Sequence, residues 1–431
     1  MSKIETAIVS LEGAKMRSTI KKTLRSLGFL SFNIHMVRGG AEGVRKCEET
    51  DEMALLILDL RNGADKVLRI LEANKKNHQL YHKPAILLSE ENSKDIKSLA
   101  KEFDILKVLV SENQERLTTS IRQILFDLNN PDEQLSQKRQ MEEFRQKNNW
   151  NSAAVICQKY YTLHPESEDW AYHVILNHLK LRRNKEAVEI IKFFSKTKDP
   201  RILDLMASVY MKKGSYIKAQ KCLNIAVKVS PLNITRLLAL GNILLNVGRW
   251  DDALKTFERI LSFAKFSREG RLGKGAALSL LGDIEEAKEV LKNAANIKEL
   301  AAVFNAAGVI AMRYENYINA ERLYETSSEY LIKYPYFRCR VLYNLGLLNV
   351  KNEMSERALA NFKRAKKMDS HFAPAKENYD FLIGRQDEAL NLEGIKLPHK
   401  SEVTIGVESN LRGSKWVDFS SIEVDDQEKA S

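Results

Sequence analysis

The sequence has few cysteines, and none of them lie close together. Its 431 residues include four cysteines, a set without the short spacings that a disulfide framework or a zinc-binding motif would show. They are Cys47, Cys157, Cys222 and Cys339. We therefore expect buried, reduced thiols and a cytoplasmic location.

Long apolar runs and catalytic motifs are also absent. No stretch approaches the ~20 apolar residues of a membrane span, and the start, MSKIETAIVS, lacks the apolar core of a secretory signal. The sequence contains no nucleophile elbow, phosphate-binding glycine loop or zinc-protease helix motif. We expect a protein that is not an enzyme, has no certain cofactor and does not span a membrane.

The charge of the chain is positive, with a formal net charge of +11. Hydrophobic residues make up 44% and charged residues 29%, as in ordinary globular proteins. The short basic clusters, such as LKLRRNK and FKRAKK, fall near expected helix ends, where cations interact favourably with the helix dipole. This favours a solvated helix surface, and nucleic acid is not the expected partner. A basic helical-repeat protein that binds nucleic acid is kept as an alternative.

What the sequence does contain is an internal repeat. Two successive helix–turn–helix units share three landmarks at a spacing of about 34 residues. The landmarks are a glycine inside the first helix (Gly241, Gly275), a glycine at its end (Gly248, Gly282) and an alanine in the second helix (Ala253, Ala287). The internal glycine and the alanine allow two helices to cross closely, and the terminal glycine suits a left-handed cap.

The same pattern continues on both sides of these two units. It can be followed through Ala153, Tyr160 and Pro165; Ala187 and Pro200; Tyr210, Gly214, Ala219, Ala226 and Pro231; Gly308, Ala320 and Tyr324; and Gly346, Ala358, Phe362 and Ala365. The arrangement resembles the tetratricopeptide repeat, which implies stacked helical hairpins that bind protein partners. We predict about seven repeats over residues 137–386, with PAKENYDFLIGRQ as a capping helix.

Residues 1–128 have a different pattern of apolar and polar residues. Short apolar runs of strand length, such as ALLILDL and PAILLS, alternate with amphipathic segments of helical length. Such an alternation predicts an α/β doubly wound sheet of five parallel strands, a flavodoxin-like fold.

Three polar residues follow the expected strands of this domain. They are Glu12 after the first strand, Asp59 at the end of the third and Ser89 at the end of the fourth. The domain resembles the receiver domain of bacterial response regulators. The resemblance implies that Asp59 is a phosphoacceptor, that Glu12 and Asp59 hold Mg²⁺, and that Ser89 contacts the phosphoryl group. It also implies a bacterial source and a histidine kinase as a partner.

The sequence departs from that family at two positions. A single acid, Glu12, stands where the family has an acidic pair, and Val110-Ser111 replaces the lysine and proline after the fifth strand. Mg²⁺ prefers several oxygen ligands, and the missing lysine removes a fixed positive charge. A degenerate receiver that binds protein without phosphorylation therefore stays open.

The remaining segments are a predicted linker at 129–136, around LNNPDEQ, and a tail at 387–431. The tail has little helical periodicity and an acidic end, so we expect it to be disordered. Its KWVDF segment is a candidate docking motif, and an untethered tail is the alternative.

The first helices of the hairpins are expected to line a peptide-binding groove. Asparagine can pair with both groups of an extended backbone, and arginine can hold a carboxylate. From the repeat phase we expect Asn242, Asn246, Asn305, Arg313, Arg340 and Tyr343 to face this groove. A plain solvated inner face explains these residues equally well.

These observations together predict a cytoplasmic signalling adaptor of the two-component type. In it, a receiver-like domain regulates or localises a tetratricopeptide array that binds a protein. The alternatives are a scaffold that works without phosphorylation and the nucleic-acid-binding protein described above.

Overall fold

The computed structural model describes residues 4–11, 13–50, 53–76, 83–110 and 113–384. The chain divides into two compact units. The first contains Met1–Leu237 and Phe263–Lys265, and the second contains Leu238–Ser262 and Phe266–Ser431. The tail predicted at 387–431 lies outside the described residues.

The first unit begins with a five-stranded parallel sheet in the order β2-β1-β3-β4-β5, the flavodoxin-like order. The predicted fold of this domain is confirmed. Its strands are β1 (Thr6–Ser10), β2 (Ile34–Val37), β3 (Ala54–Asp59), β4 (Ala85–Leu88) and β5 (Lys107–Leu109). Its helices are α1 (Ala14–Ser26), η1 (Ser31–Asn33), α2 (Gly40–Glu49), η2 (Leu60–Asn62), α3 (Ala64–Lys76), α4 (Lys94–Glu102) and α5 (Gln114–Asn129).

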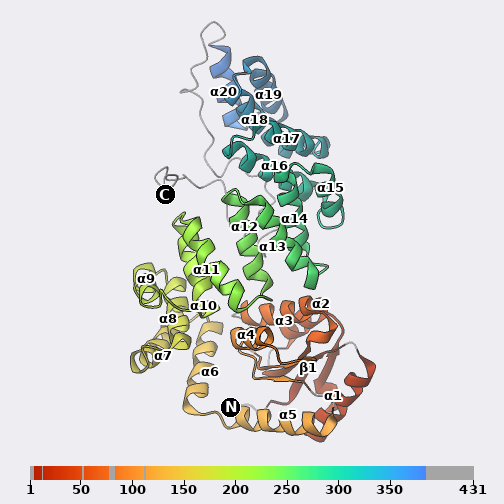
Figure 1. The fold of residues 1–431 in the computed structure, drawn as a ribbon, viewed down its shortest axis with the longest axis vertical. Helices are drawn as coiled ribbons and strands as arrows, with labels where there is room; N and C mark the ends of the chain where they lie inside the picture. The colour runs from red at the N-terminus through yellow and green to blue at the C-terminus, as the bar shows by residue number, and fades with distance from the viewer. Residues whose placement is uncertain (1–3, 12, 51–52, 77–82, 111–112, 385–431) are drawn as a thin grey trace. The chain divides into compact units, whose positions relative to one another are not determined.

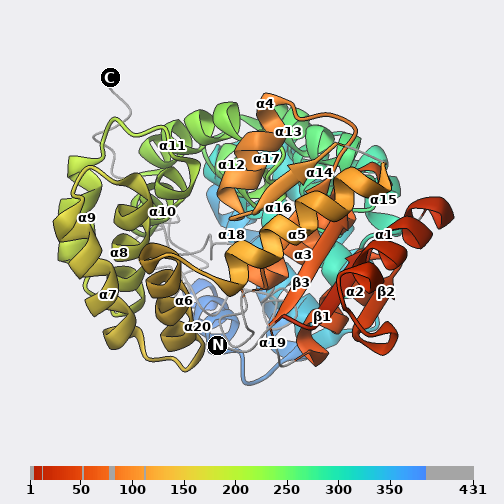
Figure 2. The same cartoon turned by 90° about the horizontal axis from the view of Figure 1, so that it is seen from below.

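Helices cover both faces of this sheet. On one face, alternate strand residues such as Val9 and Ile57 pack with residues of α1 and α5. On the other, Ile8 and Leu56 pack with residues of α2, α3 and α4. The central strands are consequently apolar apart from Thr6, Ser10 and Asp59 at their ends, as a sheet buried on both faces requires. Figure 2 shows α5 crossing in front of the strands.

The rest of the described chain is entirely helical, with fifteen helices from α6 to α20 (Figure 1). They are α6 (Glu133–Gln146), α7 (Trp150–Leu163), α8 (Glu168–Lys180), α9 (Asn184–Phe193), α10 (Pro200–Lys212), α11 (Tyr216–Val229), α12 (Ile234–Asn246), α13 (Trp250–Phe263), α14 (Arg268–Leu281), α15 (Ile284–Lys292), α16 (Ile297–Arg313), α17 (Tyr317–Tyr330), α18 (Pro335–Lys351), α19 (Ser355–Met368) and α20 (Ala373–Ile383). In chain order they make seven hairpins and one last helix, which agrees with the repeat array predicted from the sequence.

The boundaries differ in detail from those expected. α5 ends at Asn129 and α6 begins at Glu133, so only residues 130–132 separate helices where a linker over 129–136 was expected. The division between compact units falls at Leu237 rather than at this connection. The sheet domain and the first repeats therefore belong to one unit.

The repeated glycines lie where two helices of a hairpin meet. A Cβ atom added at Gly346 would stand 2.4 Å from the Phe362 ring, and one added at Gly308 would stand 2.7 Å from the Tyr324 ring. Gly241 and Gly275 approach a side chain of the second helix in the same way. Gly248 and Gly282 have the positive φ angles expected of left-handed caps, +76° and +98°.

None of the helices in the described residues is long and apolar enough to cross a membrane.

A test of the hairpin packing is the Gly346→Ala variant. Its added methyl group would overlap the fully buried Phe362 ring, and we expect the free energy of unfolding to fall by about 1–3 kcal/mol in urea denaturation. A further Phe362→Leu change should cost less in this background than in the wild type, because it relieves the overlap. Gly39→Ala is the control, since its Cβ would meet nothing within 4 Å. If the losses of free energy caused by the two substitutions simply add, the close approach of residue 346 to the Phe362 ring is contradicted.

Candidate functional site

The carboxyl ends of the strands carry Asp59, and an arginine next to it in the chain holds its side chain. Arg61 donates from Nε to Asp59 Oδ1 and from a terminal nitrogen to Oδ2, both at 2.8 Å. The backbone N–H of Arg61 also donates to Oδ1, at 3.1 Å. Asp59 is 3% exposed. A planar guanidinium therefore neutralises the carboxylate through a two-pronged contact within a three-residue turn.

The other expected strand-end residues are less informative. Ser89 is buried, and its hydroxyl accepts a hydrogen bond from the backbone N–H of Glu91 at 3.4 Å. Glu12 lies outside the described residues. Lys107 begins β5 and therefore lies at the opposite end of the strand from Asp59. Val110 is exposed just after β5, at the position where the receiver family has its lysine.

The described residues do not fit a magnesium ion at this place. Mg²⁺ requires carboxylate oxygens that are free to coordinate it, whereas both oxygens of Asp59 accept hydrogen bonds from Arg61. Within the part of the chain that the structure describes, no group of three or more His, Cys, Asp or Glu side chains could hold a metal ion. The Arg61 guanidinium supplies the positive charge that a cation would bring.

The asparagines expected to face a groove lie deeper than expected. Asn246 and Asn305 are both buried, and Asn305 Oδ1 accepts a hydrogen bond from Asn344 Nδ2 at 2.9 Å. Asn242 is half-buried, and its backbone carbonyl accepts from Asn246 Nδ2 at 2.7 Å. The Asn305–Asn344 bond connects two successive repeats, whereas the bond between Asn246 and Asn242 lies within α12.

Of the remaining residues expected in the groove, Arg313 and Arg340 are half-buried, and Tyr343 is in the core. The prediction that Tyr343 faces a groove is wrong. Its ring is fully buried and packs against Phe362 and Phe372, with centroid distances of 5.4 and 5.3 Å. The reason is that α18 is buried on all sides from Val341 to Val350, so helical phase alone does not identify an exposed face.

A buried polar cluster of the first unit joins α4 of the sheet domain to the repeats. Its centre is Arg236 in α12, which is 2% exposed. The guanidinium of Arg236 donates two hydrogen bonds to Asp204 of α10, at 2.8 and 2.7 Å, and two to Glu102 at the end of α4, at 3.3 and 2.5 Å. Burial alone would lower the pKa of Arg236, but Asp204 and Glu102 raise it above its ordinary value.

Two further side chains complete the hydrogen bonding of Glu102. The Ser230 hydroxyl donates to it at 2.7 Å, and the Asn233 side-chain amide donates to its other oxygen. Around this polar centre, Leu232, Ile234 and Phe263 pack against the apolar cluster formed by the sheet, α2, α3 and α4. The carboxylate of Glu102 is thus buried with its oxygens paired, as a stable buried charge requires.

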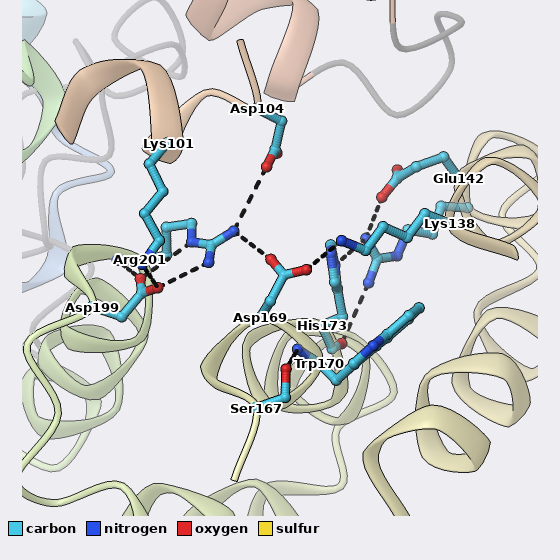
Figure 3. A network of polar contacts seen from close by, with 11 residues as sticks. Lys101, Asp104, Lys138, Glu142, Ser167, Asp169, Trp170, His173, Asp199 and Arg201 are labelled. Carbon is cyan, nitrogen blue, oxygen red and sulfur yellow. Dashed lines mark hydrogen bonds and ion pairs between the residues drawn. The ribbon is translucent and has the colours of Figure 1, made fainter. Parts of the chain in front are cut away.

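A second arginine repeats this arrangement one hairpin earlier (Figure 3). Arg201, at the start of α10, pairs with Asp199, with Asp169 of α8 at 2.8 Å and with Asp104 of the sheet domain at 3.7 Å. Lys101 of α4 reaches Asp199 at 3.8 Å. Burial alone would lower the pKa of Arg201, but Asp199, Asp104 and Asp169 raise it. We call the contacts of Arg201 and Arg236 with α4 and Asp104 the ionic seam.

Beside the ionic seam lies a cavity of about 620 Å³. Arg201, Asp104 and Asp169 line it together with Phe193 and Phe194. Acidic and basic groups alternate around this cavity, so its lining favours neither sign of charge.

His173 of α8 lies behind the ionic seam and is held neutral. Its Nδ1 atom is 3.2 Å from a terminal nitrogen of the buried Arg145 and accepts a hydrogen bond from it. Burial first, and then the charge of Arg145, lower the pKa of His173 well below its usual value. Asp169 also contacts Lys138 and Arg201. Burial alone would raise the pKa of Asp169. Three positive charges lower it instead, namely that of His173 once this residue is protonated in acid and those of Lys138 and Arg201.

Sequence reasoning missed the ionic seam, although a signal for it exists. Asp169 and Arg201 are 32 residues apart, and so are Asp204 and Arg236. An acid followed by an arginine at nearly the repeat period indicates ion pairs between successive first helices. Nothing in that spacing, however, indicates that Glu102 and Asp104 of the other domain would join them.

Comparison with known proteins finds similarity in solved structures only. No protein-family model matches the chain, and no curated protein matches it either. A tetratricopeptide repeat protein from Parabacteroides merdae is 18% identical, with 57% of this chain and 98% of that chain covered and a TM-score of 0.37. Pseudomonas aeruginosa PilF is 15% identical over 58% of this chain and 96% of its own, with a TM-score of 0.31. MamA is 19% identical over 40% and 93%, with a TM-score of 0.28.

The ionic seam predicts a large loss of stability on removal of one partner. Arg236→Met leaves the buried carboxylate of Glu102 without its cation, and we expect the free energy of unfolding to fall by about 3–5 kcal/mol. Glu102→Gln added to this variant should recover part of the loss. Arg249→Met is the control, because the exposed Arg249–Asp252 pair is worth about 0–1 kcal/mol. Urea denaturation measures the free energy of unfolding of each variant. Similar losses for Arg236→Met and Arg249→Met would contradict the stabilising role given to the ionic seam.

His173 predicts a loss of stability in mild acid. The unfolded chain protonates this histidine near a pKa of about 6.5, whereas the folded protein resists protonation. Protons therefore favour the unfolded chain below about pH 6.5, and the free energy of unfolding should fall by up to ~1.4 kcal/mol per pH unit. His173→Gln should flatten this slope between pH 6.5 and 5, and His371→Gln, at an exposed position, should leave it unchanged. An unaltered slope in His173→Gln would contradict the assignment.

Proposed function

We propose that the chain is a non-enzymatic scaffold that binds protein partners on its helical repeats. In this proposal the receiver-like domain is a fixed part of the scaffold and works without phosphorylation. Stacked helical hairpins offer a long surface for a partner. The described residues contain no group of three or more His, Cys, Asp or Glu side chains that could hold a metal ion, and Asp104 and Asp169 in the cavity beside the ionic seam are both paired with Arg201.

The ionic seam is the observation that carries this proposal. Glu102 and Asp104 of the sheet domain are bound by Arg236 and Arg201 of the repeats. A receiver that reports phosphorylation needs an element with two accessible arrangements. Here Glu102 at the end of α4 is buried and accepts hydrogen bonds from Arg236 of α12 and from Ser230 and Asn233 just before that helix, which supports a constitutive arrangement. The pairing of Asp59 with Arg61 supports it as well.

The alternative is a response regulator of the two-component type, with Asp59 as phosphoacceptor and a histidine kinase as partner. The position of Asp59 at the carboxyl end of β3, next to β4 and Ser89, favours this alternative. Phosphorylation would require the Arg61 guanidinium to release both oxygens of Asp59. On either alternative, we propose a cytoplasmic protein.

One experiment tests the proposal against its alternative. The purified protein is cross-linked to proteins of a cell extract, with and without Mg²⁺ and acetyl phosphate, and the cross-linked residues are identified by mass spectrometry. We expect cross-links on residues 133–384 that do not change with acetyl phosphate, in the wild type and in Asp59→Asn alike.

Two results would count against the scaffold. Cross-links restricted to residues 4–129 would remove the role given to the repeats. Cross-links that change with acetyl phosphate in the wild type but not in Asp59→Asn would favour the response regulator, and the intact mass of the protein would then show a phosphoryl adduct.

A further inference from the structure

A row of cations and aromatic rings follows one edge of the second unit. It lies at the amino-terminal ends of α14, α16, α18 and α20, the first helices of successive hairpins and the last helix. Its principal members are Arg268, Lys298, Lys333, Tyr336, Phe337 and Arg340. We call this row the cation–aromatic edge. Part of it is visible in the sequence as IKYPYFRCR, residues 332–340, which contains three basic and three aromatic residues.

Contacts between neighbouring hairpins make the edge continuous. Arg268 at the start of α14 pairs with Glu299 at the start of α16, at 2.5 Å. Lys298 of α16 lies over the ring of Phe337 at the start of α18, 5.1 Å from its centroid. Arg340 of α18 in turn lies 5.1 Å from the centroid of Phe372, just before α20. The edge therefore crosses four successive hairpin positions without a break.

The edge is open to solvent and positively charged. Phe266, Ile332 and Tyr336 are 71%, 63% and 55% exposed, although all three are large apolar or aromatic side chains. Two acidic residues of this edge are paired with its arginines, since Glu299 pairs with Arg268 and Asp369 lies 3.8 Å from Arg340.

Lys333 and Arg338 add to the positive charge of the edge. Lys333 is exposed in the connection before α18, and Arg338 follows within that helix. Burial, and then the charge of nearby Arg364, lower the pKa of Arg338.

The corresponding edge of the first unit shows what such a surface binds. There Arg201 and Arg236 lie at the starts of α10 and α12, the first helices of earlier hairpins. Each holds an acid of the preceding first helix and an acid of the sheet domain. Carboxylates two residues apart, Glu102 and Asp104, are thus bound by arginines of successive repeats.

We propose that the cation–aromatic edge of the second unit binds an acidic segment of a partner protein that also carries apolar or aromatic residues. The proposal rests on the proposed scaffold function and names the chemistry of the partner. Carboxylates of the segment pair with Lys333, Arg338 and Arg340, and its apolar side chains cover Phe266 and Tyr336. Exposed tyrosine and arginine together are the residue types enriched at protein–protein hot spots.

The stacking of the cations favours a protein over nucleic acid. The guanidinium of Arg340 lies 3.9 Å from the Tyr336 ring centroid, and Lys298 lies 4.7 Å from that of Tyr334. The ring face that a cation covers is not available for stacking by the bases of single-stranded nucleic acids. A guanidinium placed over a ring loses little freedom when it binds a further carboxylate.

The test uses the full chain and a fluorescent peptide of repeated Glu-Glu-Phe units, with binding followed by fluorescence anisotropy. Measurements are made at low ionic strength, where the Debye length is about 10 Å or more. The variant Lys333→Glu/Tyr336→Ser changes two exposed positions and should weaken binding about tenfold or more, because it reverses one charge and removes one ring. Lys351→Glu, at the exposed carboxyl end of the same helix α18, should weaken it less than about twofold. Thermal unfolding checks that both variants fold.

Several outcomes would overturn the proposal. These are no binding of the peptide to the wild type, equal losses in the two variants, or tighter binding of an oligothymidine than of the peptide. If cross-links to partner proteins still fall on the repeats in such a case, the scaffold function stands and only this edge is excluded. Absence of those cross-links would instead remove the scaffold function itself.

Discussion

The buried guanidinium of Arg236 is the interaction on which the first unit depends. It lies between Asp204 of the same repeat array and Glu102 of the sheet domain, and the buried Glu102 needs it to remain charged away from water. Losing Arg236 would leave the buried carboxylate of Glu102 without a cation, which costs more than the pair contributes when it is complete. The sheet domain and the neighbouring repeats are therefore energetically coupled, and their separation would expose both ions and the apolar residues around them.

This coupling relies on the close packing of the hairpins. Helices that cross at glycine and alanine hold successive first helices in a regular array, so that a side chain near the start of one helix reaches an acid on the preceding one. This packing places Arg236 against Asp204 of the preceding first helix and Arg268 against Glu299 of the following one. What differs between the units is the surrounding chemistry. In the first, a second acid from another domain completes the site, whereas in the second, exposed aromatic rings flank the cations.

The features that could be predicted from the sequence are those encoded by local patterns. Alternating apolar runs predicted the parallel sheet, and recurring glycines predicted the hairpins, because each pattern reflects the packing of neighbouring elements. Ion pairs between distant segments leave no such pattern, so the partner of Arg236 in α4 could not be predicted. Tyr343 was misplaced for a related reason, since phase identifies an exposed face only when a helix has one. The clamp of Arg61 on Asp59 lies within three residues, but a two-residue spacing is too common to indicate an ion pair.

Two contacts at different ends of the sheet domain oppose a conformational switch, namely the pairing of Asp59 with Arg61 and the ionic seam. At one end, the guanidinium of Arg61 already balances the charge that a metal ion would balance. At the other, Glu102 is bound by three side chains of the repeats, so movement of α4 would have to break several buried hydrogen bonds at once. A conformational switch needs two states that differ by only a few kcal/mol. Uncovering Glu102 and Arg236 would cost at least that much, which favours a domain that has kept the receiver-like fold as a structural support for the repeats.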